Sequence, residues 1–234
     1  MEISKLGERQ GILVPNRNGC TNFGAIALDG RRLFALKTAQ SNKKSALMIY
    51  QSYKSDANCT VRTYANQMGH GNGMTYWDGK IYVAPLDEYV QILDTQHDMR
   101  RKKIKSPIVI ASIAHVRDDL FMCGLTLVRI TDSAVEIIKR YALDWDESAF
   151  PVGQDIGYRG GYLYFVRSSK TKNSNAIVRV PFDRQADTLR PDRVYLSEKR
   201  TDLYELESID FAGKTMVFAA NIAGGKDCIF TAKM

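Results

Sequence analysis

The residues best suited to binding a ligand lie in one glycine-rich segment, Met68-Gly-His-Gly-Asn-Gly-Met-Thr-Tyr76. Glycines alternate with His70 and Asn72 there, and glycine allows a backbone to approach a ligand or a neighbouring segment closely. Histidine and asparagine side chains both donate and accept hydrogen bonds. We predict that His70 and Asn72 bind a ligand; the alternative is that both only cap the turn by bonding to the backbone. Because the glycines precede a strand and not a helix, they do not form a dinucleotide-binding fingerprint.

Carboxylates that could perform acid–base chemistry lie further along the chain, at Asp155, Glu205, Glu207 and Asp210. Glycoside hydrolysis needs an acid and a second carboxylate on opposite sides of the scissile bond. If the protein is a hydrolase, Asp155, Glu207 and Asp210 are its catalytic candidates. In a binding protein, Asp155 and Glu207 would instead orient the ligand through hydrogen bonds. The absence of a Gly-x-Ser-x-Gly elbow argues against a serine nucleophile.

Four further residues complete the candidate ligand-binding set. Gln154 would orient a ligand through its amide. Lys37 and Arg167 would bind a carboxylate or phosphate group, or are solvated strand ends. Trp145 would offer a flat face on which a sugar could stack.

No pattern in the sequence indicates a metal ion or another cofactor. His70 with Asp155 would supply only two ligands, which do not make a metal site. The cysteines are scattered without any C-x-x-C pair, at Cys20, Cys59, Cys123 and Cys228. We predict reduced packing residues, with a disulfide between Cys20 and Cys59 as the alternative.

The elements that position these residues are repeats of one strand–turn–strand unit. The copies are GAIALDGRRLFAL from Gly24, GMTYWDGKIYVA from Gly73, SIAHVRDDLFMC from Ser112, DIGYRGGYLYFV from Asp155 and SIDFAGKTMVFA from Ser208. Self-similarity at about 40–50 residues, with several strands in each unit, is typical of a β-propeller. The turns carry residues such as Asp-Gly and Gly-Gly, which adopt the positive φ that tight hairpins require. The sequence therefore predicts an all-β fold.

The last repeat indicates how the ring closes. From Ser208 to the end there is room for only three strands, whereas an orphan strand candidate, residues 11–14, precedes the first repeat. Propellers commonly complete the final blade with a strand from the other end of the chain, which removes an open edge. We predict one domain, residues 1–234, with five blades that begin near residues 24, 73, 112, 155 and 208.

The predicted fold also indicates where a ligand would bind. In propellers, the loops that enter the innermost strands and those that join the second and third strands share the face around the channel mouth. His70, Asn72, Gln154 and Glu207 belong to this face, and Lys37 and Arg167 end strands that lead to it. Carboxylates occur at the inner-strand register only in the fourth and fifth blades, which weakens the hydrolase hypothesis.

One blade resembles a known family. The segment GHGNGMTYWDGKIYVA is similar to the G-H-x-N-x-M/L-T-Y blade segment of helveticin J-like bacterial proteins, which implies a propeller that acts at bacterial surfaces. Size and blade count resemble those of tachylectin-type lectins, which bind amino sugars, although this chain lacks their near-identical repeats. The hydrolase alternative resembles five-bladed arabinanase-like enzymes, which place three carboxylates around the channel and would lead us to expect a base on the first blade.

The formal net charge of +7 favours acidic partners without selecting among them. The densest basic run, Met99–Lys105, is expected on the outermost strand of the second blade, where positive charge blocks edge-to-edge pairing. It lacks the interleaved aromatic residues that stack on single-stranded nucleic acid, so we do not expect a nucleic-acid partner. No apolar run is long enough for a membrane span, and the N-terminus lacks the pattern of a secretory signal. We expect a protein that is cytoplasmic or released without a conventional signal, unless a signal was removed; the oligomeric state is left open.

The sequence thus predicts a ligand-binding β-propeller that recognises a glycan or a bacterial cell-surface polymer at its channel mouth. Two alternatives remain open: a glycoside hydrolase of the arabinanase-like type, and a protein-interaction scaffold that uses the broad face.

Overall fold

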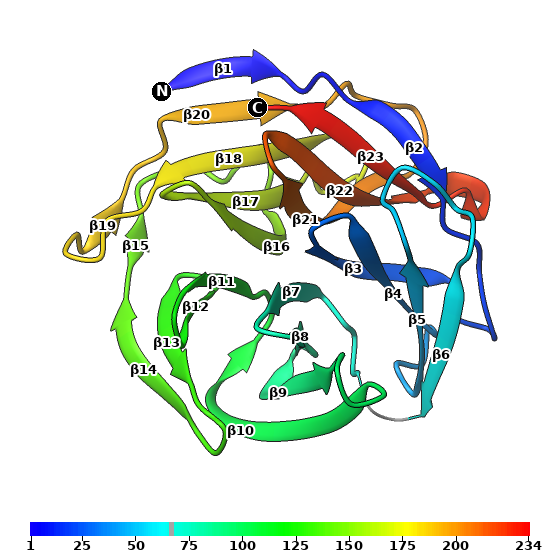
Figure 1. The fold of residues 1–234 in the computed structure, drawn as a ribbon. Helices are drawn as coiled ribbons and strands as arrows, with labels where there is room; N and C mark the ends of the chain where they lie inside the picture. Colours follow the sequence, from blue (N-terminus) through cyan, green and yellow to red (C-terminus); the bar gives the residue numbers. More distant parts are fainter. Residues whose placement is uncertain (66–67) are drawn as a thin grey trace.

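The computed structural model describes residues 1–65 and 68–234, which form a ring of five blades around a central axis (Figure 1). Each blade contains four antiparallel strands, named below from the innermost outward, and a parallel fifth strand extends the sheet of blade 4. Blade 1 contains β3 (Asn22–Asp29), β4 (Arg32–Thr38), β5 (Lys44–Tyr50) and β6 (Thr60–Ala65). Blade 2 contains β7 (Gly73–Trp77), β8 (Lys80–Ala84), β9 (Asp87–Asp94) and β10 (Arg100–Ile110). Blade 3 contains β11 (Ala114–Arg117), β12 (Leu120–Cys123), β13 (Thr126–Ile130) and β14 (Val135–Arg140).

Blade 4 contains β16 (Val152–Arg159), β17 (Tyr162–Ser168), β18 (Asn175–Pro181) and β20 (Arg193–Leu196). Blade 5 contains β21 (Tyr204–Ala212), β22 (Thr215–Ile222), β23 (Cys228–Lys233) and, outermost, β2 (Arg9–Leu13). A short 3₁₀ turn, η1 (Ala223–Gly225), joins β22 to β23. Beside blades 3 and 4, the two-residue strands β15 (Ala142–Leu143) and β19 (Thr188–Leu189) pair in parallel.

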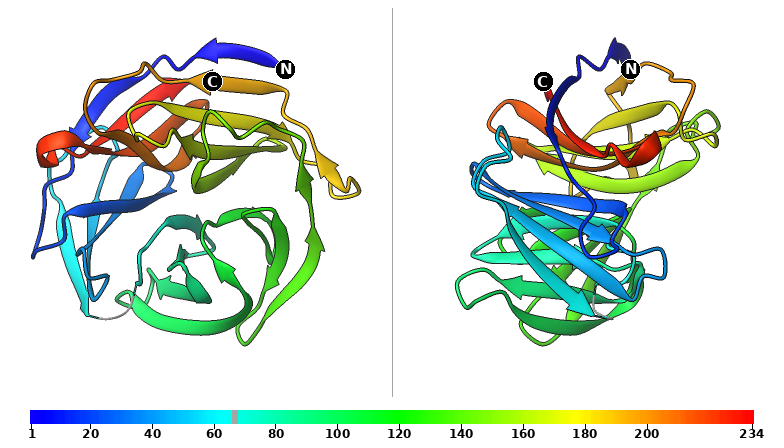
Figure 2. Two further views of the ribbon diagram at one scale, coloured as in Figure 1. Left: turned by 180° about the vertical axis from the view of Figure 1, so that it is seen from behind. Right: turned by 90° about the vertical axis from the view of Figure 1, so that its right-hand side faces the viewer.

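The predicted closure of the ring is confirmed. Strand β2 pairs antiparallel with β23, with Arg9 opposite Thr231, so a strand from the N-terminal end completes the last blade. The sequence did not indicate a second N-terminal strand, β1 (Glu2–Lys5), which pairs in parallel with β20 of blade 4. The N-terminal segment therefore crosses from the rim of blade 4 to that of blade 5, and both chain ends lie on this rim (Figure 1, Figure 2).

The middle strands of a blade are covered on both faces by neighbouring blades, which explains their near-continuous apolar sequences. In blade 1, all of β4 after Arg32 and all of β5 after Lys44 is buried. Large rings fill the wedges between blades: Tyr164 and Phe211 lie with their ring centroids 4.7 Å apart, between blades 4 and 5.

Side chains of blade 5 bond to the backbone of blade 1 where the ring closes. Ser208 Oγ accepts a hydrogen bond from Ile26 N at 3.1 Å, and Asp210 Oδ2 accepts one from Leu28 N at 2.7 Å. Each such bond contributes about 1 kcal/mol to stability, so they tie the first blade to the last. The polar residues that the sequence places near the axis are thus partly structural.

Other sequence expectations can be compared directly with the structure. Strand β10 is the outermost strand of blade 2, as predicted for the basic run. All four cysteines are free thiols, with Cys59 alone partly exposed. Across residues 1–65 and 68–234, no helix has the length and apolar character to cross a membrane.

Candidate functional site

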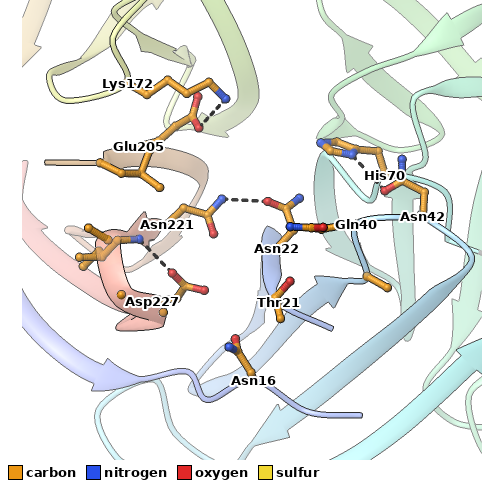
Figure 3. Close-up of a pocket in the computed structure, with 16 residues that line it drawn as sticks. Asn16, Thr21, Asn22, Gln40, Asn42, His70, Lys172, Glu205, Asn221 and Asp227 are labelled. Carbon is orange, nitrogen blue, oxygen red and sulfur yellow. Dashed lines mark hydrogen bonds and ion pairs between the residues drawn. The ribbon is translucent and has the colours of Figure 1, made fainter. Parts of the chain in front are cut away.

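A polar pocket of about 760 Å³ opens at one face of the ring (Figure 3). Its wall comes mainly from blades 1 and 5: the start of β3, the β4–β5 loop, the end of β22 and η1. Blade 2 adds His70 from the loop that enters β7, and blade 4 adds Lys172 from the β17–β18 loop. These loops are of the two kinds that surround a propeller's channel mouth, so we call this cavity the mouth pocket.

Five of the sixteen residues that line the mouth pocket carry amide side chains; they are Asn16, Asn22, Gln40, Asn42 and Asn221. Asn221 holds blades 1 and 5 together, because its Oδ1 accepts a hydrogen bond from Phe23 N at 2.9 Å and its Nδ2 donates to Asn22 Oδ1 at 3.2 Å. An amide offers both donors and acceptors, and the wall therefore matches ligands that carry many hydroxyl or amide groups.

Each carboxylate in the wall of the mouth pocket is neutralised by a lysine. Glu205, only 3% exposed, accepts a hydrogen bond from Gln154 Nε2 at 2.6 Å and pairs with Lys172 Nζ at 2.9 Å. Asp227, also 3% exposed, pairs with Lys37 Nζ at 2.6 Å. The pocket is consequently polar but close to electroneutral.

Lys37 does not present its ammonium to a ligand in this structure, contrary to its expected role. The side chain is fully buried, and besides Asp227 its Nζ donates to Asn16 Oδ1 at 2.6 Å and to Val14 O at 3.1 Å. Burial lowers the pKa of Lys37, and the charge of Asp227 opposes that shift. The residue instead ties the segment after β2 to blades 1 and 5.

Glu207 lies one strand pleat from Glu205 on β21, behind the wall of the mouth pocket. It is 5% exposed, and its Oε1 accepts a hydrogen bond from Asn221 Nδ2 at 2.5 Å. Burial, reinforced by the negative charge of Glu205, raises the pKa of Glu207 well above its usual range. Glu207 is therefore protonated more readily than a solvent-exposed glutamate.

The two polar residues of the glycine-rich segment, His70 and Asn72, have different surroundings. His70 faces the mouth pocket, half-buried, with Nδ1 3.3 Å from Asn42 Oδ1. Burial lowers the pKa of His70, and the positive charge of Lys172 lowers it further, so the imidazole is neutral at pH 7. Asn72 is 7% exposed, and its Nδ2 donates to Ala111 O at 2.9 Å. For Asn72 the structure thus shows the backbone contact that was the alternative expectation.

The glycines of this segment serve the contact between blades 1 and 2. Gly71 has a φ of +64°, and a Cβ at Gly24 would lie 2.2 Å from Gly71 O. Only glycine permits so close an approach of the two backbones. Their packing brings His70 to the edge of the mouth pocket.

Asp155 fills the channel below the mouth. It is 2% exposed and accepts a hydrogen bond from Ser208 Oγ at 2.5 Å, and a Cβ at Gly73 would lie only 2.3 Å from its Oδ1. Burial raises the pKa of Asp155 well above its usual range. Asp210 lies further along the channel, and burial raises its pKa to about 6. Neither residue lines the mouth pocket.

The remaining candidates lie beside the mouth pocket. A smaller cavity of about 200 Å³ on the blade 3–blade 4 side is lined by Gln154, Asp155 and Arg167. Arg167 pairs with Glu147 at 2.5 Å, and its guanidinium carbon lies 5.7 Å from the centroid of the Trp145 ring. This cation therefore covers a face of the partly buried Trp145 that a sugar would otherwise use.

Sequence reasoning missed Asn221, Lys172, Asp227 and Asn42 as wall residues. The loops that carry Asn42, Lys172 and Asn221 were expected at the mouth, whereas Asp227 follows the last of them; loop asparagines and lysines are common, and their spacing shows no pattern. Asparagines concentrated in loops of one predicted face would have been the available signal. Among residues 1–65 and 68–234, no three His, Cys, Asp or Glu side chains cluster closely enough to hold a metal ion.

Fold and pocket together define the class of protein: a five-bladed β-propeller with a neutral, amide-lined pocket at the channel mouth. Solved structures support the fold. A crystal structure of Myxococcus xanthus glutaminyl cyclase is similar with a TM-score of 0.65 and 10% identity, over 99% of this chain and 98% of that one.

Two glycosidases share the architecture. A GH43 β-xylosidase/α-arabinofuranosidase from a compost microbial metagenome, in complex with xylotriose, has a TM-score of 0.57 at 11% identity, covering 97% of this chain and 94% of that one. A further β-xylosidase has a TM-score of 0.54 at 9% identity with the same coverage of both chains. At such identities the likeness shows the fold alone. No protein-family model matches the sequence, and no curated protein matches it either.

Proposed function

We propose that the protein binds a neutral, hydroxyl-rich ligand, a glycan of a bacterial cell surface, in the mouth pocket. The observation that carries this proposal is the wall itself: amide side chains from blades 1 and 5 and from the segment after β2, with every wall carboxylate neutralised by a lysine. A volume of about 760 Å³ lies within the range of pockets that hold small ligands, about 300–1,000 Å³. The surface origin of the glycan rests on the resemblance to helveticin J-like proteins.

Neutrality of the wall favours uncharged sugars over an anionic polymer at this place. A charged ligand would be desolvated without gaining an unpaired partner of opposite sign. A sugar hydroxyl, in contrast, can both donate to and accept from the same amide. His70, neutral and half-buried, extends this hydrogen-bonding surface toward blade 2.

Titration calorimetry with a panel of neutral trisaccharides (xylotriose, cellotriose and chitotriose) tests the proposal. At least one should bind, and His70→Ala and Asn42→Ala should each weaken it about tenfold, the equivalent of about 1.4 kcal/mol. Gln51→Ala, an exposed amide outside the pocket, is the matched control and should bind like the original protein. Binding that survives both pocket substitutions would place the ligand elsewhere, and absence of binding by the whole panel would contradict the proposal.

A glycoside hydrolase is the second candidate, because a carboxylate in the wall, Glu205, has a protonation-prone neighbour in Glu207. Hydrolysis of xylotriose, followed as reducing-sugar release, should then be abolished by Glu207→Gln. Release without dependence on Glu205 or Glu207 would rule out this pair. Binding of sugar without release favours the lectin-like function. If the protein shows neither binding nor release, the result favours the interaction scaffold.

A further inference from the structure

A second cavity, of about 630 Å³, lies at the opposite end of blade 5. The mouth pocket is lined by the end of β22 at Ile222, whereas this cavity is lined by its start at Thr215. Seven residues of extended strand separate the two by about 23 Å. One side of the cavity is the N-terminal segment from Lys5 to Gly11, and the other is the turn after β5 at Tyr53 and Lys54. We call it the basic groove.

The wall of the basic groove contains four cations and no carboxylate: Lys5, Arg9, Lys54 and Lys233. All four are exposed. Lys5 pairs with Glu198, but within the described part of the chain the other three form no ion pair. Positive charges held together without compensation repel one another and create a potential that attracts anions.

The nearest acidic residue of the same segment is turned away from the groove. Glu8 is directed toward blade 5, where it accepts a hydrogen bond from Tyr204 and pairs with Arg200 at 3.4 Å. Arg9, the first residue of β2, instead lines the groove. The single negative charge of this segment is thus held away from the positive charges that line the groove.

The other basic surface of the molecule differs in this respect. A cavity beside β10 also contains cations, but Asp94 and Asp132 line it as well. Asp132 lies 3.5 Å from Lys102 and 3.9 Å from Lys80, so charge is partly compensated there. Arg100 and Arg101 of that cavity form no ion pair among the described residues, but two carboxylates share its wall, whereas the wall of the basic groove holds three unpaired cations and no carboxylate.

We propose that the basic groove is a second binding site, for a polyanionic glycan bearing sulfate, phosphate or carboxylate groups. Three unpaired cations would each replace a counterion of such a polymer, and the released counterions drive association. Gln10, Thr215 and Thr231 supply neutral hydrogen-bonding groups between the charges. The aromatic residue of the wall, Tyr53, is 7% exposed and lies 5.4 Å from Lys54 Nζ, so the groove offers no free ring for a nucleobase to stack on. This site is independent of the mouth pocket and its ligand.

The test uses dextran sulfate as the probe and fluorescence anisotropy as the measurement. The variant Arg9→Gln/Lys54→Gln/Lys233→Gln should bind at least tenfold more weakly at low salt. The slope of log K against log salt concentration should become shallower by about two, because each of the three lost ion contacts contributes about 0.7 for a single flexible strand. The charge-conserving variant Arg9→Lys/Lys54→Arg/Lys233→Arg should retain binding, which separates lost charge from a disturbed fold.

The matched control removes the same charge from the other basic surface. Arg101→Gln/Lys102→Gln/Lys105→Gln also lowers the formal net charge from +7 to +4, but should leave the affinity within about twofold and the salt slope unchanged. Equal weakening by both triple variants would overturn the proposal in favour of a net-charge effect. It would equally be overturned if the groove variant bound like the original protein, or if single-stranded DNA of matched charge bound more tightly than dextran sulfate.

Discussion

The mouth pocket and the basic groove lie at opposite ends of the same blade, and they treat charge in opposite ways. At the mouth, both wall carboxylates have a lysine partner, and burial raises the pKa of the neighbouring Glu207. In the groove, three cations have no partner among the described residues. If both sites bind ligands as proposed, hydrogen-bond geometry would select the ligand at one end of the blade, whereas charge would select it at the other.

Both regions depend on the closure of the ring. Strand β2 supplies a wall of the groove, and the segment that follows it supplies Asn16 to the mouth pocket. Lys37 bonds to Val14 and Asn16 of that segment and to Asp227 of blade 5. A single buried cation therefore holds the N-terminal segment, blade 1 and blade 5 together where the ring closes. The substitution with the largest expected effect therefore lies at this closure of the ring.

The largest effect is expected from breaking the buried ion pair. Asp227→Asn leaves the fully buried Lys37 ammonium without a counter-charge, which should lower the free energy of unfolding by about 3 kcal/mol or more. Urea denaturation measures this loss. Lys37→Met/Asp227→Asn should recover most of it, because no charge then remains buried; a double variant as unstable as the single one would contradict the pairing.

The second largest effect is expected from salt, which should weaken ligand binding at the basic groove far more than at the mouth pocket. Raising NaCl from about 50 to about 500 mM should weaken binding of dextran sulfate to the groove by about 100-fold, because three ion contacts release counterions. Binding of a neutral trisaccharide at the mouth should change less than about twofold, since its hydrogen bonds involve no net charge. Parallel titrations over the same salt series would show it, and equal salt dependence would erase the contrast between the regions.

The channel carboxylates predict a pH dependence of stability. The pKa of Asp210 is raised to about 6, so the folded state holds a proton that the unfolded state has already lost above pH 4. Its contribution is fully present below pH 4 and is lost as pH rises through about 6, an effect of about 3 kcal/mol. Asp210→Asn keeps an acceptor for Leu28 N but cannot ionise.

The variant and the original protein should therefore have similar stability at pH 4, with the variant more stable at pH 8. Thermal melts across this range provide the measurement. A constant difference between the two proteins at all pH values would show that Asp210 does not titrate in this way.

The fold was largely predictable, because its signals are local. Short apolar runs and turn pairs such as Asp78-Gly79 mark most hairpins, and the lack of room for a fourth strand after Ser208 indicates that an N-terminal strand closes the ring. Strand β1 was not predictable. Its few residues, Glu2–Lys5, have no distinctive pattern, and their pairing with β20 depends on where the closed ring leaves the chain.

The sequence indicated where the candidate pocket lies, but not the contacts that its side chains make. Reasoning from loops found His70 and the neighbourhood of Glu205, both of which line the mouth pocket. It could not tell that Lys37 is buried or that Arg167 is engaged by Glu147, because ion pairs between distant segments leave no trace in spacing. Nor could it show the basic groove, whose cations come from both ends of the chain and one turn of blade 1.

The smallest effect is expected from a substitution that gives the mouth pocket an unpaired cation, as in the basic groove. Glu205→Gln preserves the shape of the side chain and an acceptor for Gln154, but it leaves Lys172 as an uncompensated cation in the wall of the mouth pocket. Because Lys172 is about half exposed, solvent screens its charge, and a gain of only about threefold in affinity for a sulfated monosaccharide is expected. Affinity for the neutral trisaccharide should barely change.

Glucose 6-sulfate is a suitable probe, measured by calorimetry at low salt. The matched control is Glu147→Gln, which removes the same charge from an ion pair outside the mouth pocket and should give no gain. Addition of salt should abolish the gain for Glu205→Gln, since it arises from a single screened charge. If both substitutions raise the affinity equally, net charge and not the wall of the pocket decides which ligands enter, and the distinction between the two ends of blade 5 fails.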